Sequence, residues 1–204
     1  MKVLKFGGTS VGTASSIKKV KDIIAKESID DKVIVVVSAM TQVTNKLLAA
    51  SSIAARGNES YKETIKELEN KHFDTIRELV PIDQQSGVIA TIKVLLNQLE
   101  DILNGVFLVR ELSPKTSDYI VSFGESLSSI IISKSIGAEL VDSKSLILTN
   151  NEHGGATVQY DKTYKNINDF FKSSNSKVFV APGFVASTDC LLYTSPSPRD
   201  FEAS

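Results

Sequence analysis

The sequence has 204 residues, of which 42% are hydrophobic and 23% charged, and its formal net charge is -1 at pH 7. This composition is typical of a folded globular protein and excludes a chain that is disordered throughout. The balanced charge provides no basic field for nucleic acid, and no apolar run approaches the roughly 18 residues of a membrane span, so neither partner is expected.

The N-terminal part of the chain predicts a strand, a helix and a second strand. Val3 to Phe6 form the first short strand, and "TASSIKKVKDIIAKES" follows with apolar residues at helical spacing and Thr13 or Ser15 as the N-cap. The next segment, "KVIVVVSAM", is an almost continuous β-branched run, which is typical of a strand buried on both faces of a parallel sheet.

The middle and the end of the chain alternate between helices and strands. Helices over 58–80 and 84–103, separated by Pro81, predict an antiparallel helical hairpin at about 58–104. A further helix is expected to begin near Ser117 or Asp118 and to end at Gly137. Strands in "AELVDS" and "SLILTN", a helix in "YDKTYKNINDFFKSS" and a strand in "KVFVAPGF" complete the pattern. The alternation predicts a three-layer α/β/α sandwich with a mostly parallel sheet.

The last segment, 186–204, differs in composition from the rest. "DCLLYTSPSPRDFEAS" has prolines among serines and no periodicity, so we expect an irregular, non-native tail after a domain that spans 1–185. The single cysteine, Cys190, falls in this tail. One cysteine excludes an internal disulfide framework, and the opening residues form no signal peptide, so we expect a cytoplasmic protein.

The motif "KFGGTS" stands at the end of the first predicted strand. In a parallel sheet the ligand crevice lies at the carboxyl ends of the strands, where Gly7, Gly8 and Ser38 all fall. Glycines let the backbone approach a ligand closely, the following helix offers a positive N-terminus, and Lys5 adds a cation for a phosphate oxygen. The alternative is a tight turn beside a solvated lysine. The pattern is neither a P-loop nor GxGxxG.

Two further motifs fall near the same crevice. "SAMTQVTN" supplies Ser38 and Thr44 for a small polar substrate, although Thr41 or Thr44 could instead only cap the next helix.

"SFGES" places Gly124 and Glu125 inside an otherwise apolar helix, which suggests the close approach of another backbone or a ligand. The alternative for Glu125 is a surface position at the edge of the apolar stripe. His72 is expected at the boundary of the core, His153 lies in a loop, and no pattern of metal ligands is present.

Together these motifs resemble the aspartate kinases of the amino acid kinase superfamily. The matching segments are "KFGGTSVG", "VVVSAMTQVTN", "SFGESLSS" and "APGF", and "ELSPKTSDYIVSFGESLSSIIIS" is most similar to the kinase part of bifunctional aspartate kinase–homoserine dehydrogenases. The resemblance covers about residues 1–185 and implies that the chain is a truncated, N-terminal, substrate-binding part of such a kinase domain.

The resemblance implies transfer of the γ-phosphate of ATP, with Mg²⁺, to the side chain of L-aspartate, the first step towards lysine, threonine and methionine. It implies a homo-oligomer at full length. It also implies the roles of several residues: Lys5 in catalysis, Gly7, Gly8, Thr9 and Ser10 with Lys5 at the phosphates, and Ser38, Thr44 and Glu125 at the substrate, with Glu125 pairing with its ammonium group.

The chain also departs from the family. After "PGF" the family continues to Gly-Arg-Gly-Gly-Ser-Asp, where this chain has "VASTDCLLYTSPSPRD", so we expect little or no kinase activity from this polypeptide alone. Two alternatives remain open. One is another amino acid kinase, acting on glutamate, acetylglutamate, uridylate or carbamate, and the other is a module that binds an amino acid without transferring phosphate.

Overall fold

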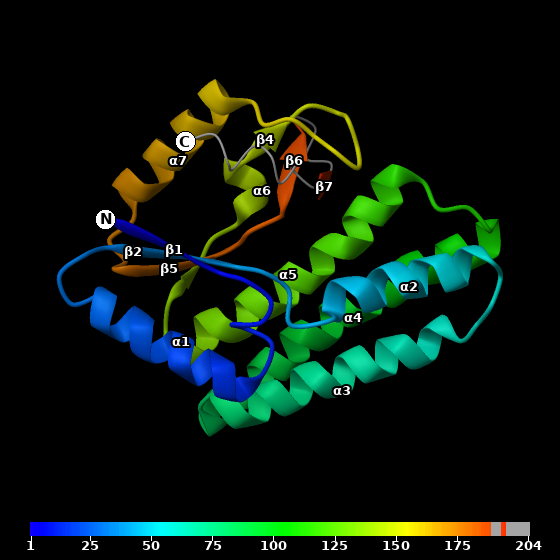
Figure 1. Cartoon of the computed structure of the whole chain (residues 1–204), viewed down its shortest axis with the longest axis horizontal. Coiled ribbons are helices and arrows are strands. Elements are labelled where there is room, and N and C mark those ends of the chain that lie inside the picture. Colours follow the sequence, from blue (N-terminus) through cyan, green and yellow to red (C-terminus); the bar gives the residue numbers. More distant parts are fainter. Residues whose placement is uncertain (189–192, 195–204) are drawn as a thin grey trace.

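The molecule combines a small parallel sheet with a bundle of long helices (Figure 1). The structure is a computed structural model that describes residues 1–188 and the backbone of 193–194. Its strands are β1 (Lys2–Phe6), β2 (Val33–Val37), β3 (Glu139–Leu140), β4 (Leu148–Thr149), β5 (Val178–Pro182), β6 (Ala186–Thr188) and β7 (Tyr193–Thr194). Its helices are α1 (Ala14–Glu27), α2 (Val43–Ala55), α3 (Tyr61–Leu79), α4 (Ile82–Val109), α5 (Pro114–Ile136), α6 (Ser143–Leu146) and α7 (Tyr160–Ser173).

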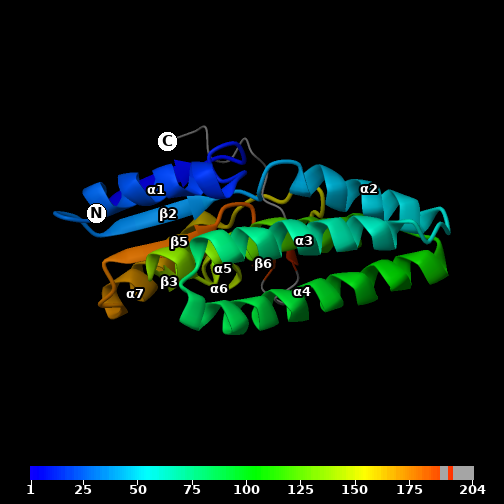
Figure 2. The ribbon, with the colours of Figure 1, turned by 90° about the horizontal axis from the view of Figure 1, so that it is seen from below.

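The main sheet has the strand order β1-β2-β5-β3, and all of its neighbouring strands are parallel. Val33, Val35 and Val37 of β2 belong to the large core that includes residues of α1 and α5. Ile34 and Phe179 point to the opposite face, where they pack with residues of α7. Helices therefore lie on both sides of the sheet, as Figure 2 shows for α1 and α7. The predicted three-layer α/β fold with a mostly parallel sheet is confirmed. A smaller sheet, β4-β6-β7, contains one antiparallel pair.

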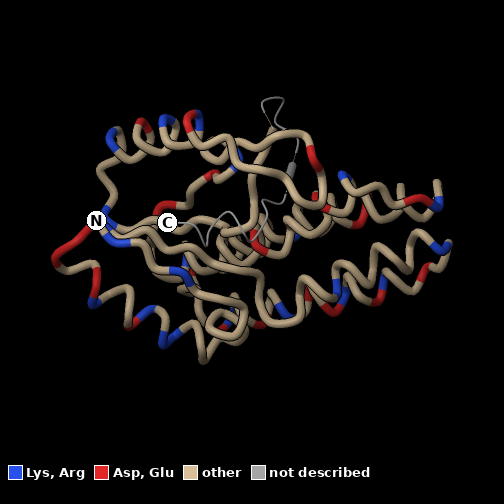
Figure 3. Tube along the Cα trace, turned by 45° about the horizontal axis from the view of Figure 1, so that its top comes forward, with Lys and Arg blue, Asp and Glu red and all other residues tan. Residues whose placement is uncertain are grey.

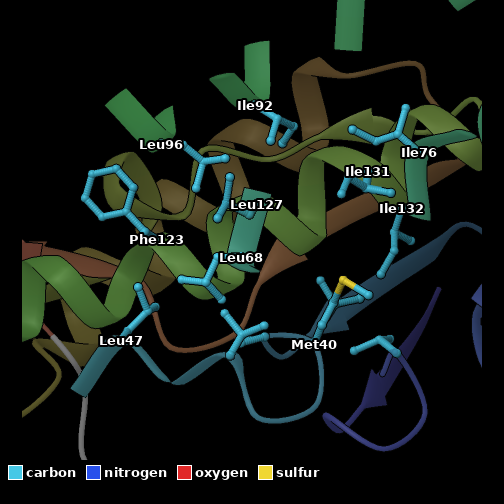
Figure 4. Close-up of a cluster of buried hydrophobic side chains, with 14 of the residues drawn as sticks. Met40, Leu47, Leu68, Ile76, Ile92, Leu96, Phe123, Leu127, Ile131 and Ile132 are labelled. Carbon is cyan, nitrogen blue, oxygen red and sulfur yellow. The ribbon is translucent and has the colours of Figure 1, made fainter. Parts of the chain in front are cut away.

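The helices α2 to α5 form one bundle beside the sheet. Leu47 of α2, Leu68 of α3, Leu96 of α4 and Leu127 of α5 are each at most 1% exposed, and they point towards one another (Figure 4). The predicted hairpin of two helices is thus part of a four-helix arrangement. The helix α5 packs both in the bundle and against the sheet, so it links the two.

Two helix boundaries differ from those predicted. The helix α4 continues to Val109 rather than ending near residue 103, because Val106 extends its buried face. The helix α5 begins at Pro114, several residues earlier than expected, because Ser113 caps it by accepting a hydrogen bond from the Thr116 amide at 3.1 Å. Its end at Gly137, which has φ +66°, is as predicted.

The N-cap of α1 is Thr13, one of the two residues predicted for that position. Its hydroxyl accepts a hydrogen bond from the Ser16 amide at 3.2 Å, and the Ser16 hydroxyl accepts one from the Thr13 amide at 3.1 Å. This reciprocal pair fixes where α1 begins after the glycine turn.

Strand β6 lies inside the segment expected to be irregular from residue 186. Ser187 is fully buried, its amide donates to the Ile147 carbonyl at 3.1 Å, and its hydroxyl donates to the Lys144 carbonyl at 2.7 Å. Partners contributed by the α6–β4 region hold this strand, so regular structure extends beyond the predicted boundary. Strand β7 also falls in the predicted tail, and the remaining residues, 189–192 with Cys190 and 195–204, lie outside the described residues.

Charged residues of both signs are interspersed along the helices (Figure 3). This distribution agrees with the net charge of -1. Within the described part of the chain, no helix has the length and apolar character needed to cross a bilayer.

The side chain of His72 is fully buried in α3, and the prediction of a boundary position was wrong. Its Nδ1 lies 2.6 Å from the Leu68 carbonyl, which can only accept, so Nδ1 carries the proton. Its Nε2 is buried without a hydrogen-bond partner among the described residues. Burial lowers the pKa of His72 from 6.5 to about 4 because a charged ring would lack water, although the Leu68 carbonyl opposes this shift.

We therefore predict that His72 makes the fold sensitive to acid. The unfolded chain binds a proton at this ring below pH 6.5 while the folded chain stays neutral down to about pH 4, so stability falls across that interval. The loss should reach about 3 kcal/mol at pH 4. Urea unfolding of the wild type and His72→Leu at pH 7 and pH 4 measures it. The variant should lose less stability on acidification than the wild type. Equal losses in wild type and His72→Leu would contradict the prediction.

Candidate functional site

A cleft of about 390 Å³ opens at the carboxyl edge of the sheet. The turn after β1, the loop after β2, the start of α2, one face of α5 and the turn after β5 contribute to its lining. Among the predicted site residues, the structure brings together Gly8, Ser38, Thr44 and Glu125 around this cleft. Its position agrees with the expectation that ligands of a parallel sheet bind where the strands end.

The carboxylate of Glu125 is the buried charged group of this cleft, and its residue is 8% exposed. Its Oε2 accepts a hydrogen bond from the backbone amide of Phe184, just after β5. Burial raises the pKa of Glu125 from 4.5 to about 7, while the amides of Phe184, Gly183 and Ala39 and the charge of Lys5 act in the opposite direction. The alternative of a surface glutamate is therefore wrong.

Close packing of α5 on the loop after β2 explains the glycine beside Glu125. A Cβ atom on Gly124 would lie 2.9 Å from the Cβ of Ala39 and 3.3 Å from side-chain atoms of α2. The hydroxyl of Ser128, one turn later, donates to the Ser38 carbonyl at 2.7 Å. A close approach at Gly124 is present, but the nearest atoms belong to the side chains of Ala39, Leu47 and Val43, whereas the sequence predicted a backbone or a ligand there.

The turn after β1 is closely packed at Gly8 and Gly12 but open at Gly7. A Cβ on Gly8 would lie 3.2 Å from the Ala39 carbonyl oxygen, whereas one on Gly7 would meet no atom within 4 Å. A Cβ on Gly12 would lie 2.0 Å from Oγ1 of Thr41 and 2.8 Å from the Gly8 carbonyl oxygen. Packing therefore requires glycine most strongly at Gly12, which ends the motif "KFGGTSVG" but for which the sequence predicted no role.

The start of α2 forms one wall of the cleft. The N-cap residue is Gln42, whose φ of +66° is left-handed, and no side chain caps the helix. Thr41 donates its hydroxyl to the Gly8 carbonyl at 2.8 Å, so the expectation that Thr41 or Thr44 caps this helix was wrong. Instead, the positive end of α2 faces the cleft together with Thr44 and Asn45.

Four of the five residues predicted to bind phosphate do not line the cleft, among them Lys5, Thr9 and Ser10. The side chain of Lys5 is exposed near the end of β1, although its charge acts on Glu125. Gly7 also lies outside the lining, next to Gly8.

Eight residues line the cleft without having been predicted as site residues: Ala39, Met40, Thr41, Gln42, Asn45, Val121, Ser122 and Phe184. The "APGF" segment carried the signal for Phe184, but the contribution of its backbone amide is visible only in three dimensions.

Comparison with known proteins gives a family match over most of the chain. The sequence profile described as "Amino acid kinase family" matches residues 1–194. "Bifunctional aspartokinase/homoserine dehydrogenase 1, chloroplastic" of Arabidopsis thaliana is 27% identical over 192 residues, which is 91% of this chain and 21% of that protein. "Aspartokinase 1, chloroplastic" of the same organism is 39% identical over 132 residues, covering 63% of this chain and 22% of that protein. The chain thus spans about a fifth of the length of these relatives.

Solved structures share the fold. The structure of E. coli aspartokinase III in complex with lysine and aspartate superposes with a TM-score of 0.84 at 23% identity, over 96% of this chain and 43% of that one. The same enzyme in complex with aspartate and ADP gives a TM-score of 0.82 at 24% identity, over 95% and 42% of the two chains. At this identity the likeness concerns the fold alone.

The contrast between Gly12 and Gly7 gives a prediction about stability. We expect Gly12→Ala to cost about 1–3 kcal/mol, because the new methyl group overlaps Thr41 and the Gly8 carbonyl. Gly7→Ala is the matched control, since it meets open space and should change stability by less than about 1 kcal/mol. Urea unfolding of both variants measures the difference. Equal effects of the two substitutions would contradict the packing described for this turn.

Burial of Glu125 gives a second prediction, on the pH dependence of stability. The pKa of this acid is raised from 4.5 to about 7 in the folded chain, so the folded state holds the proton more tightly than the unfolded state. Its contribution to stability is complete below pH 4.5 and is lost as the pH rises through about 7, a loss of about 2–3 kcal/mol between pH 5 and pH 8.

The test compares urea unfolding at pH 5 and pH 8 for the wild type, Glu125→Gln and the exposed control Glu63→Gln. Glu125→Gln should remove this part of the pH dependence because a neutral amide cannot ionise, and Glu63→Gln should retain it. An unchanged pH dependence in Glu125→Gln would show that the carboxylate is not desolvated.

Proposed function

The chain belongs to the amino acid kinase family, and from this premise we propose that it is part of an aspartate kinase. The proposed reaction transfers the γ-phosphate of ATP to the side-chain carboxylate of L-aspartate and gives 4-phospho-L-aspartate and ADP. The relatives named aspartokinase support this choice within the family. The E. coli aspartokinase III structures, solved with aspartate and with ADP, agree with it.

The observation that carries the proposal is a buried carboxylate, Glu125, in a small cleft that is otherwise lined by hydroxyls, by the side-chain amides of Gln42 and Asn45, and by the positive end of a helix. This arrangement suits an amino acid, which carries an ammonium group and carboxylates. We assign the ammonium group to Glu125 and the carboxylates to Ser38, Thr44 and the start of α2. An arriving ammonium group favours ionised Glu125, because an opposite charge nearby lowers the pKa of an acid.

The chemistry requires no general base. The aspartate side chain has an ordinary pKa of about 3.9, so it is already a nucleophilic anion at neutral pH. One carboxylate oxygen forms a bond to the γ-phosphorus, and the bond from that phosphorus to the bridging oxygen breaks, which leaves ADP. The obstacle is the repulsion between two anions, so positioning and positive charge supply the catalysis.

We assign that positive charge to Lys5 and the phosphate contacts to the turn that follows it. Lys5 lies near the end of β1, outside the lining of the cleft but close enough for its charge to act on Glu125. A donor phosphate held by Lys5 and by Gly7, Gly8, Thr9 and Ser10 would therefore lie next to an amino acid in the cleft. This is the geometry that phosphoryl transfer between them requires.

The described residues do not form a site for Mg²⁺ by themselves. No group of three or more histidine, cysteine, aspartate or glutamate side chains within the described part of the chain is arranged to hold a metal ion. Since Mg²⁺ often binds chiefly through substrate phosphates and water, we propose that it arrives with ATP. The contribution of the chain itself is to bind and orient the two reactants.

Three further properties remain predictions. The cleft is expected to take a small molecule, and a homo-oligomer is expected of a full-length protein. The sequence favours the cytoplasm, whereas the Arabidopsis relatives are chloroplastic by name.

The test of the proposed function is an assay of aspartyl phosphate and ADP formation. A full-length protein that contains this chain should turn over with L-aspartate and ATP and should not accept glutamate or acetylglutamate, and the 204-residue chain alone should show little or no turnover. Lys5→Ala should abolish transfer but leave the unfolding midpoint unchanged, because its side chain is exposed.

Lys2→Ala is the matched control on the same strand. Lys2 pairs with Glu27 and Asp31 on the surface, an arrangement that contributes little to stability, so this variant should retain transfer. Turnover with another acid in place of aspartate would indicate a different amino acid kinase. Aspartate binding without transfer, unaffected by Lys5→Ala, would indicate a binding module.

A further inference from the structure

Thr41 connects the two loops that meet at the cleft. The segments that follow β1 and β2 run side by side in both views (Figures 1 and 2). The Thr41 hydroxyl donates to the Gly8 carbonyl at 2.8 Å, and the absence of a side chain at Gly12 leaves the space that the hydroxyl occupies. The turn after β1 therefore closes around this one hydroxyl group.

The backbone of Thr41 is held from the opposite side by the helical bundle. Lys71 of α3 donates its ammonium group to the Thr41 carbonyl at 2.9 Å, directly before the left-handed residue Gln42. Lys71 is half-buried, and both burial and the nearby charge of Lys46 lower its pKa. Thr41 is therefore bonded through its carbonyl to α3 and through its hydroxyl to the turn after β1.

This hydrogen bond determines which way the Gly8–Thr9 peptide faces. The peptide is trans, so its carbonyl and its N–H point in opposite directions. With the Gly8 carbonyl directed at Thr41, the Thr9 amide points away from Thr41. Without this bond, the exposed turn could rotate the carbonyl oxygen towards a bound phosphate, which it would repel, whereas an amide attracts it.

We propose that Thr41 is a positioning residue for phosphoryl transfer, which holds the phosphate-binding turn in its donor orientation against the loop that binds the acceptor. The inference rests on the proposed function, because it assigns the phosphates to the turn after β1. It extends that function with Thr41, which lines the cleft but directs its hydroxyl at the Gly8 carbonyl rather than at a reactant. It also gives the α3 helix, through Lys71, a part in supporting the site.

The test uses the ¹⁵N-labelled 204-residue chain and two variants that differ in one group each. Thr41→Val keeps the shape but removes the hydroxyl, and Thr41→Ser keeps the hydroxyl. Inorganic tripolyphosphate is the probe for the phosphate site, L-aspartate is the probe for the acceptor site, and the Thr9 amide signal reports on the peptide.

We expect Thr41→Val to weaken tripolyphosphate binding about five- to tenfold, the size expected for one neutral hydrogen bond, and to shift the Thr9 amide. Its aspartate affinity should stay within about twofold of the wild type, and Thr41→Ser should restore tripolyphosphate binding to within about twofold. A uniform loss for both ligands would indicate a general disturbance of the cleft and would overturn the inference. So would equal effects of the valine and serine variants, or an unchanged tripolyphosphate affinity in Thr41→Val.

Failure of the proposed function gives a different result. If the wild-type chain bound neither tripolyphosphate nor aspartate, the assignment of the cleft to these ligands would be contradicted. The Thr9 amide signal would then be the measurement that tests the proposed orientation of the Gly8–Thr9 peptide. An unchanged Thr9 amide shift in Thr41→Val would overturn it, and a changed shift would support it.

Discussion

The site depends on the burial of one carboxylate between the ends of adjacent strands. Glu125 accepts a hydrogen bond from the backbone amide of Phe184 after β5, and α5, which carries Glu125, lies against the loop after β2. A buried carboxylate is costly unless amides and positive charge compensate for the lost water. The compensation here is partial, as a pKa of about 7 indicates, and the cleft therefore provides a strong position for a cationic group. The ammonium group of a bound ligand would add to the compensation that the main-chain amides give the Glu125 charge.

The helix α5 makes this burial possible because one side of it packs in the hydrophobic core and another side lines the cleft. Phe123, Leu127 and Ile131 fix it in the hydrophobic core, while Ser122 and Glu125 on another side line the cleft. Gly124 removes the side chain that would separate α5 from Ala39. Packing energy from the bundle thus holds a polar residue at a place that it would not occupy by itself. The packing of the four helices therefore determines where Ser122 and Glu125 lie in the cleft.

The two loops at the carboxyl edge are also joined to each other and to the bundle. Thr41 links the turn after β1 to the loop after β2, and Lys71 ties that loop to α3. Ser128 adds a contact from α5. A donor and an acceptor bound at such coupled loops would keep a fixed separation. Phosphoryl transfer between two anions depends on this kind of positioning, since no proton has to be removed from the acceptor.

The sequence by itself determined the elements and the edge at which they form a site. Local signals suffice for this: the β-branched run of β2, the cap at Thr13 and the stop at Gly137 are all encoded within a few neighbouring residues. The tertiary structure decided which of the candidates meet. It brought Glu125 to the amide of Phe184, placed Lys5 beside the cleft rather than in its lining, and buried His72. It also turned Thr41 from an expected helix cap into a link to Gly8. These outcomes depend on atoms that are far apart in the chain, and one sequence records which residues are present but not which distant backbone group each will face.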